Sequence, residues 1–193
     1  MLGEHQPSCY CPIMRPHHIR EVLFTRAMIQ QRVNQVVDSM APDCHAENFA
    51  MIGILRGSFM FLADLVRDLY QHDVHPRIDF ITLESYYSGT ESTGSVHVAK
   101  DISLDVKGAT VLLVDDILDS GRTLSFARNH LLEKGAIEIK TCTLLDKPSR
   151  RVVPLAADHV GFTIEDTFVV GYGLDYDGYY RELPHIAKVT FTS

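Results

Sequence analysis

Three features are scarce in this chain: paired cysteines, long apolar runs and positive charge. The four cysteines form no CxxC pair and no matched spacing with histidine: Cys9, Cys11, Cys44 and Cys142. This pattern indicates neither a disulfide framework nor a zinc site, and it predicts free thiols in a reducing cytoplasm. The longest apolar run, Phe49 to Leu55, is well short of the roughly 20 residues that cross a membrane. We therefore expect a cytoplasmic protein with no membrane partner.

The deficit of positive charge extends over the whole chain. The 193 residues include 18 Lys and Arg against 25 Asp and Glu, which gives a net charge of -7. Such a chain is a poor candidate for non-specific binding to nucleic acid, so no nucleic-acid partner is expected. A polyanionic ligand would have to be held locally, by backbone amides, a few cations or a metal ion. With 46% hydrophobic residues, this length suits one full core and a single domain.

Helical and strand patterns alternate through the first three quarters of the chain. Apolar faces and buried apolar runs predict helices over 25–41, 59–70 and 122–134, and strands over 49–55, 78–84, 110–114 and 137–145. This order predicts an α/β fold with a central, mostly parallel sheet flanked by helices. Beyond residue 147 only short strands are expected, near 160–164, 168–172 and 187–191.

Two segments break the alternation. Residues 1–18 are rich in Pro and His and are expected to be a loosely ordered leader. Residues 85–108 are polar, with one exposed strand expected over 96–102. A long polar loop inside a compact domain is usually functional or disordered.

The strongest local signal is a strand that runs into acidic residues and then into a helix. Asp115 and Asp116 follow the apolar run 111–114, and the carboxyl ends of strands are where open α/β sheets bind ligands. The loop 119–123, Asp-Ser-Gly-Arg-Thr, precedes a helix. Backbone N–H groups and the helix dipole at such a position suit a phosphate.

A simpler interpretation of this loop is a helix cap. Asp119 or Ser120 could accept a hydrogen bond from the first turn of the helix and do nothing more. Three carboxylates fall within the five residues 115–119, however. Concentrated negative charge is costly unless it meets hydroxyl groups, a metal ion or a proton, so a ligand site is the better prediction.

These residues resemble the phosphoribosyl-diphosphate (PRPP) motif of the type I phosphoribosyltransferases, which has four apolar residues, two acids and an acid-Ser/Thr-Gly-x-Thr loop. Further segments resemble one branch of that family, the hypoxanthine-guanine phosphoribosyltransferases, in the same order. They are the pyrophosphate loop at 55–58, the start of the mobile catalytic loop at Ser85 and Tyr86, Lys147 after a strand, the purine hood at 168–176 and the closing segment 180–184. The resemblance covers about residues 19–191.

The resemblance implies a reaction in purine salvage. The 5-phosphoribosyl group of PRPP would pass to hypoxanthine or guanine, giving IMP or GMP and pyrophosphate, with Mg²⁺ as cofactor. Asp119 would be the general base that accepts the purine N7 proton. Asp115 and Asp116 would hold the ribose hydroxyls and orient Mg²⁺ through water, whereas Asp175 would bind the metal directly. The 5′-phosphate would be held by Ser120, Gly121, Arg122 and Thr123.

The resemblance also implies which residues bind the leaving pyrophosphate and which bind the incoming purine. Pyrophosphate would be bound by Arg56, Gly57, Ser85, Tyr86 and Arg181. In the purine site, Lys147 would donate to the oxygen at C6, Phe168 would stack on the base, Val169 would contact it through its backbone, and Asp175 would lie beside it.

The same resemblance implies a domain plan. Residues 19–193 would form one phosphoribosyltransferase domain with a core at about 26–147 and a mobile loop at about 85–100. A small hood over the purine site would be formed by the C-terminal part and residues near 19–25. A homodimer or homotetramer is expected.

Three alternatives are weighed against this interpretation. A phosphoacceptor receiver domain also has paired acids after a strand, but after its first strand, and here only 78 of the 193 residues follow Asp115. A PRPP-binding regulatory protein on the same fold would need a basic face or an added module for nucleic acid. A xanthine-preferring sibling enzyme stays open, because the sequence does not rank hypoxanthine, guanine and xanthine.

Overall fold

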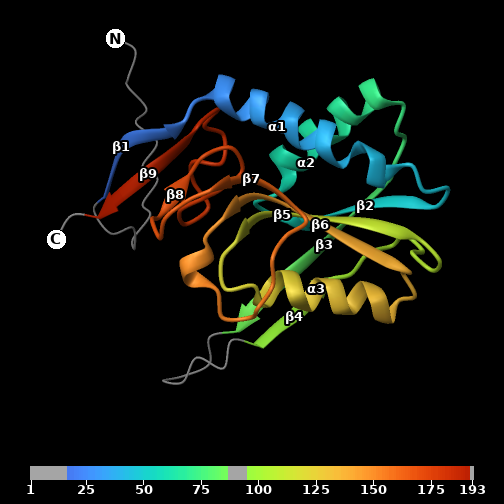
Figure 1. Ribbon diagram of the computed structural model, residues 1–193. Helices are drawn as coiled ribbons and strands as arrows, with labels where there is room; N and C mark the ends of the chain where they lie inside the picture. Colours follow the sequence, from blue (N-terminus) through green and yellow to red (C-terminus); the bar gives the residue numbers. More distant parts are fainter. Residues whose placement is uncertain (1–16, 87–94, 192–193) are drawn as a thin grey trace, which may run out of the picture.

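A six-stranded sheet forms the centre of the computed structural model, which describes residues 17–86 and 95–191 (Figure 1). The strand order is β4-β3-β2-β5-β6-β7, and every neighbouring pair is parallel except β3 and β4. The strands are β2 (Phe49–Leu55), β3 (Arg77–Tyr86), β4 (Ser95–Lys100), β5 (Thr110–Leu118), β6 (Glu138–Asp146) and β7 (His159–Thr163). The predicted α/β class and mostly parallel sheet are confirmed.

Helices cover both faces of this sheet (Figure 1). In β5, Leu112 and Val114 pack with α1 (Arg26–Met40) and α2 (Phe59–Leu69), whereas Val111 and Leu113 pack with α3 (Arg122–Glu133). Successive side chains of a strand point to opposite faces, so one apolar strand serves two cores. The predicted helices and buried strands agree with these bounds to within a few residues. Short 3₁₀ helices follow three of the elements: η1 (Ala41–Cys44), η2 (Tyr70–His72) and η3 (Pro148–Arg150).

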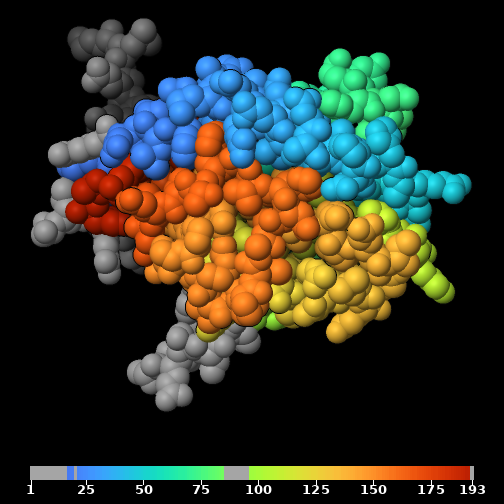
Figure 2. Space-filling model, in the orientation of Figure 1, coloured from blue at the N-terminus to red at the C-terminus, as the bar shows by residue number. Residues whose placement is uncertain are grey.

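A separate three-stranded antiparallel sheet forms the hood, in the order β1-β9-β8. Its strands are β1 (His17–Phe24), β8 (Val169–Val170) and β9 (Ile186–Phe191). The two ends of the described chain therefore lie side by side, and Figure 2 shows the red and orange C-terminal segments against the blue N-terminal ones. The stacked rings of Phe24 and Phe162, 3.9 Å between centroids, join the hood to the end of β7.

Two boundaries from the sequence differ from the structure. His17 and His18 belong to β1 and pair with Phe191 and Thr190, so the segment set apart as a leader ends two residues too late; residues 1–16 lie outside the described residues. The backbone of residues 85, 86 and 95–100 pairs as β3 and β4, so only part of the expected mobile loop 85–100 remains, and its residues 87–94 are not described. Among the described residues, no helix has the length and apolar character to cross a bilayer.

Candidate active site

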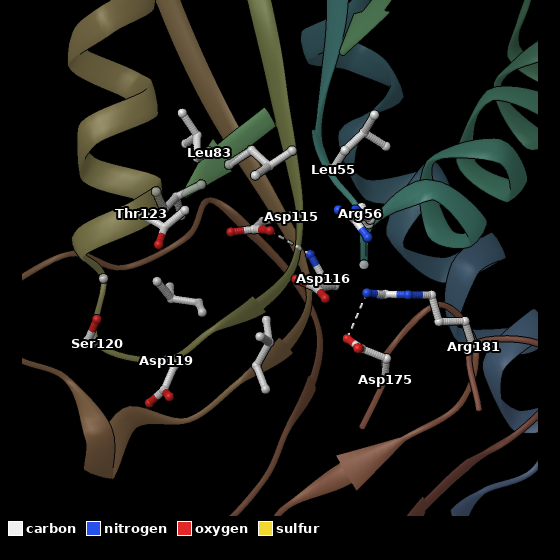
Figure 3. A pocket seen from close by; sticks show the side chains of 16 residues that line it. Leu55, Arg56, Leu83, Asp115, Asp116, Asp119, Ser120, Thr123, Asp175 and Arg181 are labelled. Carbon is white, nitrogen blue, oxygen red and sulfur yellow. Dashed lines mark hydrogen bonds and ion pairs between the residues drawn. The ribbon is translucent and has the colours of Figure 1, made fainter. Parts of the chain in front are cut away.

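Two adjoining cavities open at the carboxyl ends of the central strands. The first, about 380 Å³, lies between the 54–57 segment at the end of β2, the end of β5 and the loop 119–124 (Figure 3). The second, about 430 Å³, lies between the end of β5, the segment 147–150 and the hood. Four residues line both cavities: Asp116, Ile117, Asp119 and Asp175. Molecules bound in the two cavities would meet at this shared wall.

Asp115 and Asp116 lie in the first cavity, still within β5. The strand was expected to end at residue 114, but Asp115 pairs with Thr143 of β6 and the ladder continues to Leu118. Asp115 is only 5% exposed, and the backbone N–H of Asp116 donates to its Oδ1 at 3.0 Å. Burial, and then the neighbouring Asp116 carboxylate, raise the pKa of Asp115 well above its usual value. Burial also raises the pKa of Asp116.

The 56–57 turn packs directly against Asp116. A Cβ atom at Gly57 would lie 1.5 Å from Asp116 Oδ2, so no side chain fits there without movement of the carboxylate or the turn. A Cβ at Gly173 of the hood would lie 2.2 Å from the Gly57 carbonyl oxygen. The peptide bond between Leu55 and Arg56 is cis. Gly57, Asp116 of β5 and Gly173 of the hood are far apart in the chain, yet they pack so closely that no side chain fits at either glycine.

The backbone carbonyl groups of Leu118 and Ser120 accept hydrogen bonds from the segment 147–153. Lys147 N–H donates to Leu118 O at 3.0 Å, and the N–H groups of Val152 and Val153 donate to Ser120 O at 2.9 and 3.0 Å. Gly121, at φ 84°, turns the chain into α3, whose N-terminus has no side-chain cap. Apart from Arg122 N–H, which makes a long bond to Ser120 Oγ, the first-turn N–H groups of α3 have no side-chain acceptor among the described residues. They suit an anion such as a phosphate.

Asp119 does not cap α3, so the simpler interpretation of this loop is wrong. Its Oδ1 instead accepts a hydrogen bond from Nε of Arg150 at 3.0 Å, and the two side chains form an ion pair. The cap position is occupied by Gly121, and Ser120 Oγ accepts only a long bond of 3.4 Å from Arg122 N–H. The Asp119 carboxylate is thus placed at the wall between the cavities rather than on the helix.

The second cavity combines a buried lysine with aromatic and apolar walls. Lys147 is 7% exposed, and no described residue forms a hydrogen bond or ion pair with its Nζ. A buried ammonium group without a protein partner is costly, so it marks a place for a ligand acceptor. Phe168 is 42% exposed, and Ile117 and Leu174 supply further apolar surface. A flat heterocycle with one carbonyl oxygen suits these walls.

Asp175 and Arg181 are joined across the hood side of the first cavity. Arg181 Nη2 lies 2.8 Å from Asp175 Oδ1, and Arg181 Nη1 donates to Gly173 O at 2.6 Å. Gly178 N–H donates to Asp175 Oδ2 at 2.7 Å. Figure 3 shows this pair facing Asp116. The guanidinium is thereby held in a fixed orientation, suitable for diphosphate oxygens.

Most of the predicted site residues are brought together in the two cavities. The first is lined by Arg56, Gly57, Asp115, Asp116, Asp119, Ser120, Gly121, Thr123, Asp175 and Arg181. The second adds Lys147, Phe168 and Val169. Arg122 lines neither cavity. Ser85 and Tyr86 lie at the end of β3, and their side chains are outside the described parts of the structure.

Arg150 and Asp166 were missed by the sequence analysis. Both line the second cavity, and Arg150 Nη1 lies 3.5 Å from Asp166 Oδ2. The only signal for Arg150 was its position three residues after Lys147. A surface arginine in a polar turn carries no distinguishing pattern of its own.

Comparison with known proteins agrees with this geometry. The family described as "Phosphoribosyl transferase domain" matches residues 26–177. The chain is 44% identical to the hypoxanthine phosphoribosyltransferase of Salmonella typhimurium, covering 89% of this chain and 96% of that protein. It is 41% identical to the hypoxanthine-guanine phosphoribosyltransferase of Streptococcus pneumoniae, covering 90% and 94%.

A solved structure is similar over the same length. The hypoxanthine phosphoribosyltransferase of Trypanosoma cruzi in complex with the product IMP matches with a TM-score of 0.81 and 38% identity, covering 88% of this chain and 94% of that one. Both the family match and the identity extend over most of the chain, and the central sheet is mostly parallel with helices on both faces. The chain therefore belongs to the phosphoribosyl transferase family and has the type I fold.

Proposed function

We propose that this chain transfers the 5-phosphoribosyl group of PRPP to hypoxanthine or guanine, giving IMP or GMP and pyrophosphate. The observation that carries the proposal is the shared wall of the two cavities. One cavity offers carboxylates, loop N–H groups and two arginines, which suit a sugar phosphate with a diphosphate. The other offers a buried lysine and apolar walls, which suit a 6-oxopurine. The two ligands would meet at Asp116, Ile117, Asp119 and Asp175.

The chemistry requires one bond to form and one to break at the anomeric carbon of ribose. A purine ring nitrogen forms the new bond, and pyrophosphate leaves with the electron pair of the broken carbon–oxygen bond. The purine N7 proton passes to the Asp119 carboxylate, which acts as general base. Arg56 and Arg181 bind the departing diphosphate, and the loop 119–123 holds the 5′-phosphate through its N–H groups.

The donor set of the first cavity fits Mg²⁺ bound together with its substrate. Among the described residues, no group of three or more His, Cys, Asp or Glu could hold a metal ion alone. Mg²⁺ commonly takes one or two carboxylates and completes its shell with water and substrate phosphates. Asp175 would be the direct ligand, with Asp115 and Asp116 acting through water; bound Mg²⁺ would neutralise charge on the diphosphate. The raised pKa values of Asp115 and Asp116 indicate carboxylates that a nearby cation would favour in the charged form.

Base choice is the sharpest test of this function. Lys147 only donates hydrogen bonds when charged, so it favours a carbonyl over an amine at C6. We expect hypoxanthine or guanine to be converted with PRPP and Mg²⁺, and adenine to be converted at least about 100-fold more slowly, as expected when a buried polar group is left unpaired. Xanthine is assayed alongside these bases, because Lys147 contacts the purine at C6 and does not discriminate between bases that differ at C2.

The Lys147→Met variant supplies the matched control, because it keeps the length of the side chain and removes the charge. It should lose the preference for a 6-oxopurine while the KM for PRPP stays near the wild-type value. Comparable rates with adenine in the wild-type protein would overturn the assignment of Lys147. Full turnover in excess chelator would overturn the role of Mg²⁺.

A homodimer or homotetramer in the cytoplasm is part of the proposal. Ile78 and Phe80 lie on the same face of β3 and are exposed, which suits burial against a second copy. Cys44 and Cys142 are free buried thiols, as expected in a reducing compartment. Sedimentation of the wild-type protein and of Phe80→Glu tests the association: the variant should dissociate, and a monomeric wild type would contradict it.

A further inference from the structure

Arg150 is placed between two carboxylates that come from different parts of the site. Its Nε lies 3.0 Å from Oδ1 of Asp119, and its Nη1 lies 3.5 Å from Oδ2 of Asp166. Asp119 belongs to the loop after β5, and Asp166 belongs to the segment that leads into β8 and Phe168. All three residues line the second cavity. The planar guanidinium group is suited to hold two acceptors at once in fixed directions.

The backbone also fixes where Arg150 points. Arg150 ends the single turn η3, which begins immediately after Lys147, and Arg150 N–H donates to Lys147 O at 3.1 Å. Lys147 directly precedes this turn, and both side chains line the second cavity. Lys147 and Arg150 are therefore presented together to the cavity, one to the purine and one to the Asp119 carboxylate.

The geometry points to Arg150 as a positioning residue for the general base. We propose that the Arg150 guanidinium holds Oδ1 of Asp119, so that the second carboxylate oxygen is presented to the purine N7 proton. That second oxygen has no hydrogen-bond partner among the described residues. Asp166 in turn keeps Arg150 in place. The inference rests on the proposed role of Asp119 as base, and Arg150 acts only through it.

This role differs from that of an ordinary surface ion pair. The Arg150 side chain is 52% exposed and that of Asp119 40% exposed. A pair with this exposure contributes little to folding stability. Its effect should therefore be seen in the rate of nucleotide formation and not in the melting temperature.

The test is the single-turnover rate of IMP formation from hypoxanthine and PRPP, which separates chemistry from product release. Arg150→Ala should lower this rate about fivefold, the size expected for an exposed ion pair. Its KM for PRPP and its melting temperature should match those of the wild type. Arg150→Lys should recover part of the loss, because it keeps the charge but not the planar fork. Asp166→Asn, which leaves the pair with Asp119 intact, should lose about twofold by the same reasoning.

Lys140→Ala is the matched control. Lys140 forms a partly exposed ion pair with Glu138 at the start of β6, outside both cavities of the site, so its loss should leave the rate unchanged. A double-mutant cycle tests the route of action. In an Asp119→Ala background, Arg150→Ala should lower the rate no further.

The outcomes separate this inference from the proposed function. A wild-type rate for Arg150→Ala, together with a large loss for Asp119→Ala, overturns the role of Arg150 alone. A further fivefold loss in the Asp119→Ala background also overturns it, because Arg150 would then act by another route. A wild-type rate for Asp119→Ala overturns the base role itself, and with it the inference.

Discussion

The loop after β5 and the hood bring residues to one site by different routes. Asp115 to Thr123 form a single continuous segment, and the end of β5 and the start of α3 hold both its ends. The hood depends on pairing between the two ends of the described chain, with His17 opposite Phe191. The loop is encoded locally, whereas the hood exists only once distant segments have paired. We therefore expect changes in the loop to alter chemistry and PRPP binding, and changes in the hood to alter stability and base binding.

Asp119→Asn is the largest expected effect and tests the loop side of the comparison. Asn keeps the size and shape of the side chain but is a far weaker base. The single-turnover rate should fall about 100-fold or more, with PRPP still bound. Since Asp119 does not cap α3, the melting temperature should stay near that of the wild type. A wild-type rate would show that the carboxylate only positions ligands.

Gly57→Ala should have the next largest effect, because a Cβ there overlaps Asp116 Oδ2. Overpacking of this kind costs about 1–3 kcal/mol, and the KM for PRPP should rise about tenfold if 1.4 kcal/mol of this falls on binding. Gly108→Ala is the control: it places a side chain at a positive φ of 70° but has no atom within 4 Å of the new Cβ, whereas Gly57 has no positive φ and its new Cβ meets Asp116. Gly108→Ala should lose stability with an unchanged KM. Equal KM values for the two variants would contradict the close packing at Asp116.

Asp79 offers a pH test within the central sheet. Its carboxylate accepts hydrogen bonds from the N–H groups of Phe80, Ser103 and Leu104. Burial acts to raise its pKa, but these bonds outweigh burial and the pKa lies below its usual value. Because the folded pKa is lowered, the stabilisation is complete above the unfolded pKa of about 3.9 and is lost as the pH falls through the folded value.

Asp79→Asn should therefore destabilise the protein by about 1–2 kcal/mol at pH 7. The difference from the wild type should shrink below about pH 4, where the wild-type carboxylate becomes protonated. Urea unfolding at both pH values measures this. A difference that is independent of pH would mean that the charge of Asp79 is not involved.

Tyr172→Phe is the smallest expected effect and tests the hood side. The Tyr172 hydroxyl donates to Asp64 Oδ2 at 2.5 Å and so joins the hood to α2. Burial, and then this bond, raise the pKa of Tyr172, so the hydroxyl stays a donor at any working pH. Its loss should cost about 1 kcal/mol of unfolding free energy. The KM for hypoxanthine should rise and that for PRPP should not. The reverse pattern would contradict the expectation that changes in the hood alter base binding.

Much of the central sheet was predictable from pattern alone. The run Phe49–Leu55 is apolar throughout and is buried on both faces of the sheet, as observed for β2. The helix predicted from Thr25 begins there, because its side chain accepts from Met28 N–H. The end of β5 was not predictable, because two adjacent aspartates after an apolar run are typical of the start of a turn. Pairing with β6 carries the strand through them to Leu118.

The hood was predicted only through resemblance, and its first strand was partly missed. His17 and His18 are polar and follow a Pro- and His-rich segment, so no local period marks them as strand. They become strand because β9 offers them backbone partners. The stability of a strand depends on its cross-strand partners, and the sequence of one segment does not show which partners it will have.

By itself the sequence determined the class of the fold, through its apolar periodicity, and the strand end with two acids followed by the loop 119–123, through residues adjacent in the chain. The hood segments were placed by resemblance. Only the tertiary structure decided that Asp119 pairs with Arg150 instead of capping α3, because their side chains are 31 positions apart in the chain. It also decided that the two cavities share one wall, because Asp116 lies in β5 and Asp175 in the segment between β8 and β9, and the two meet only when the hood packs over β5.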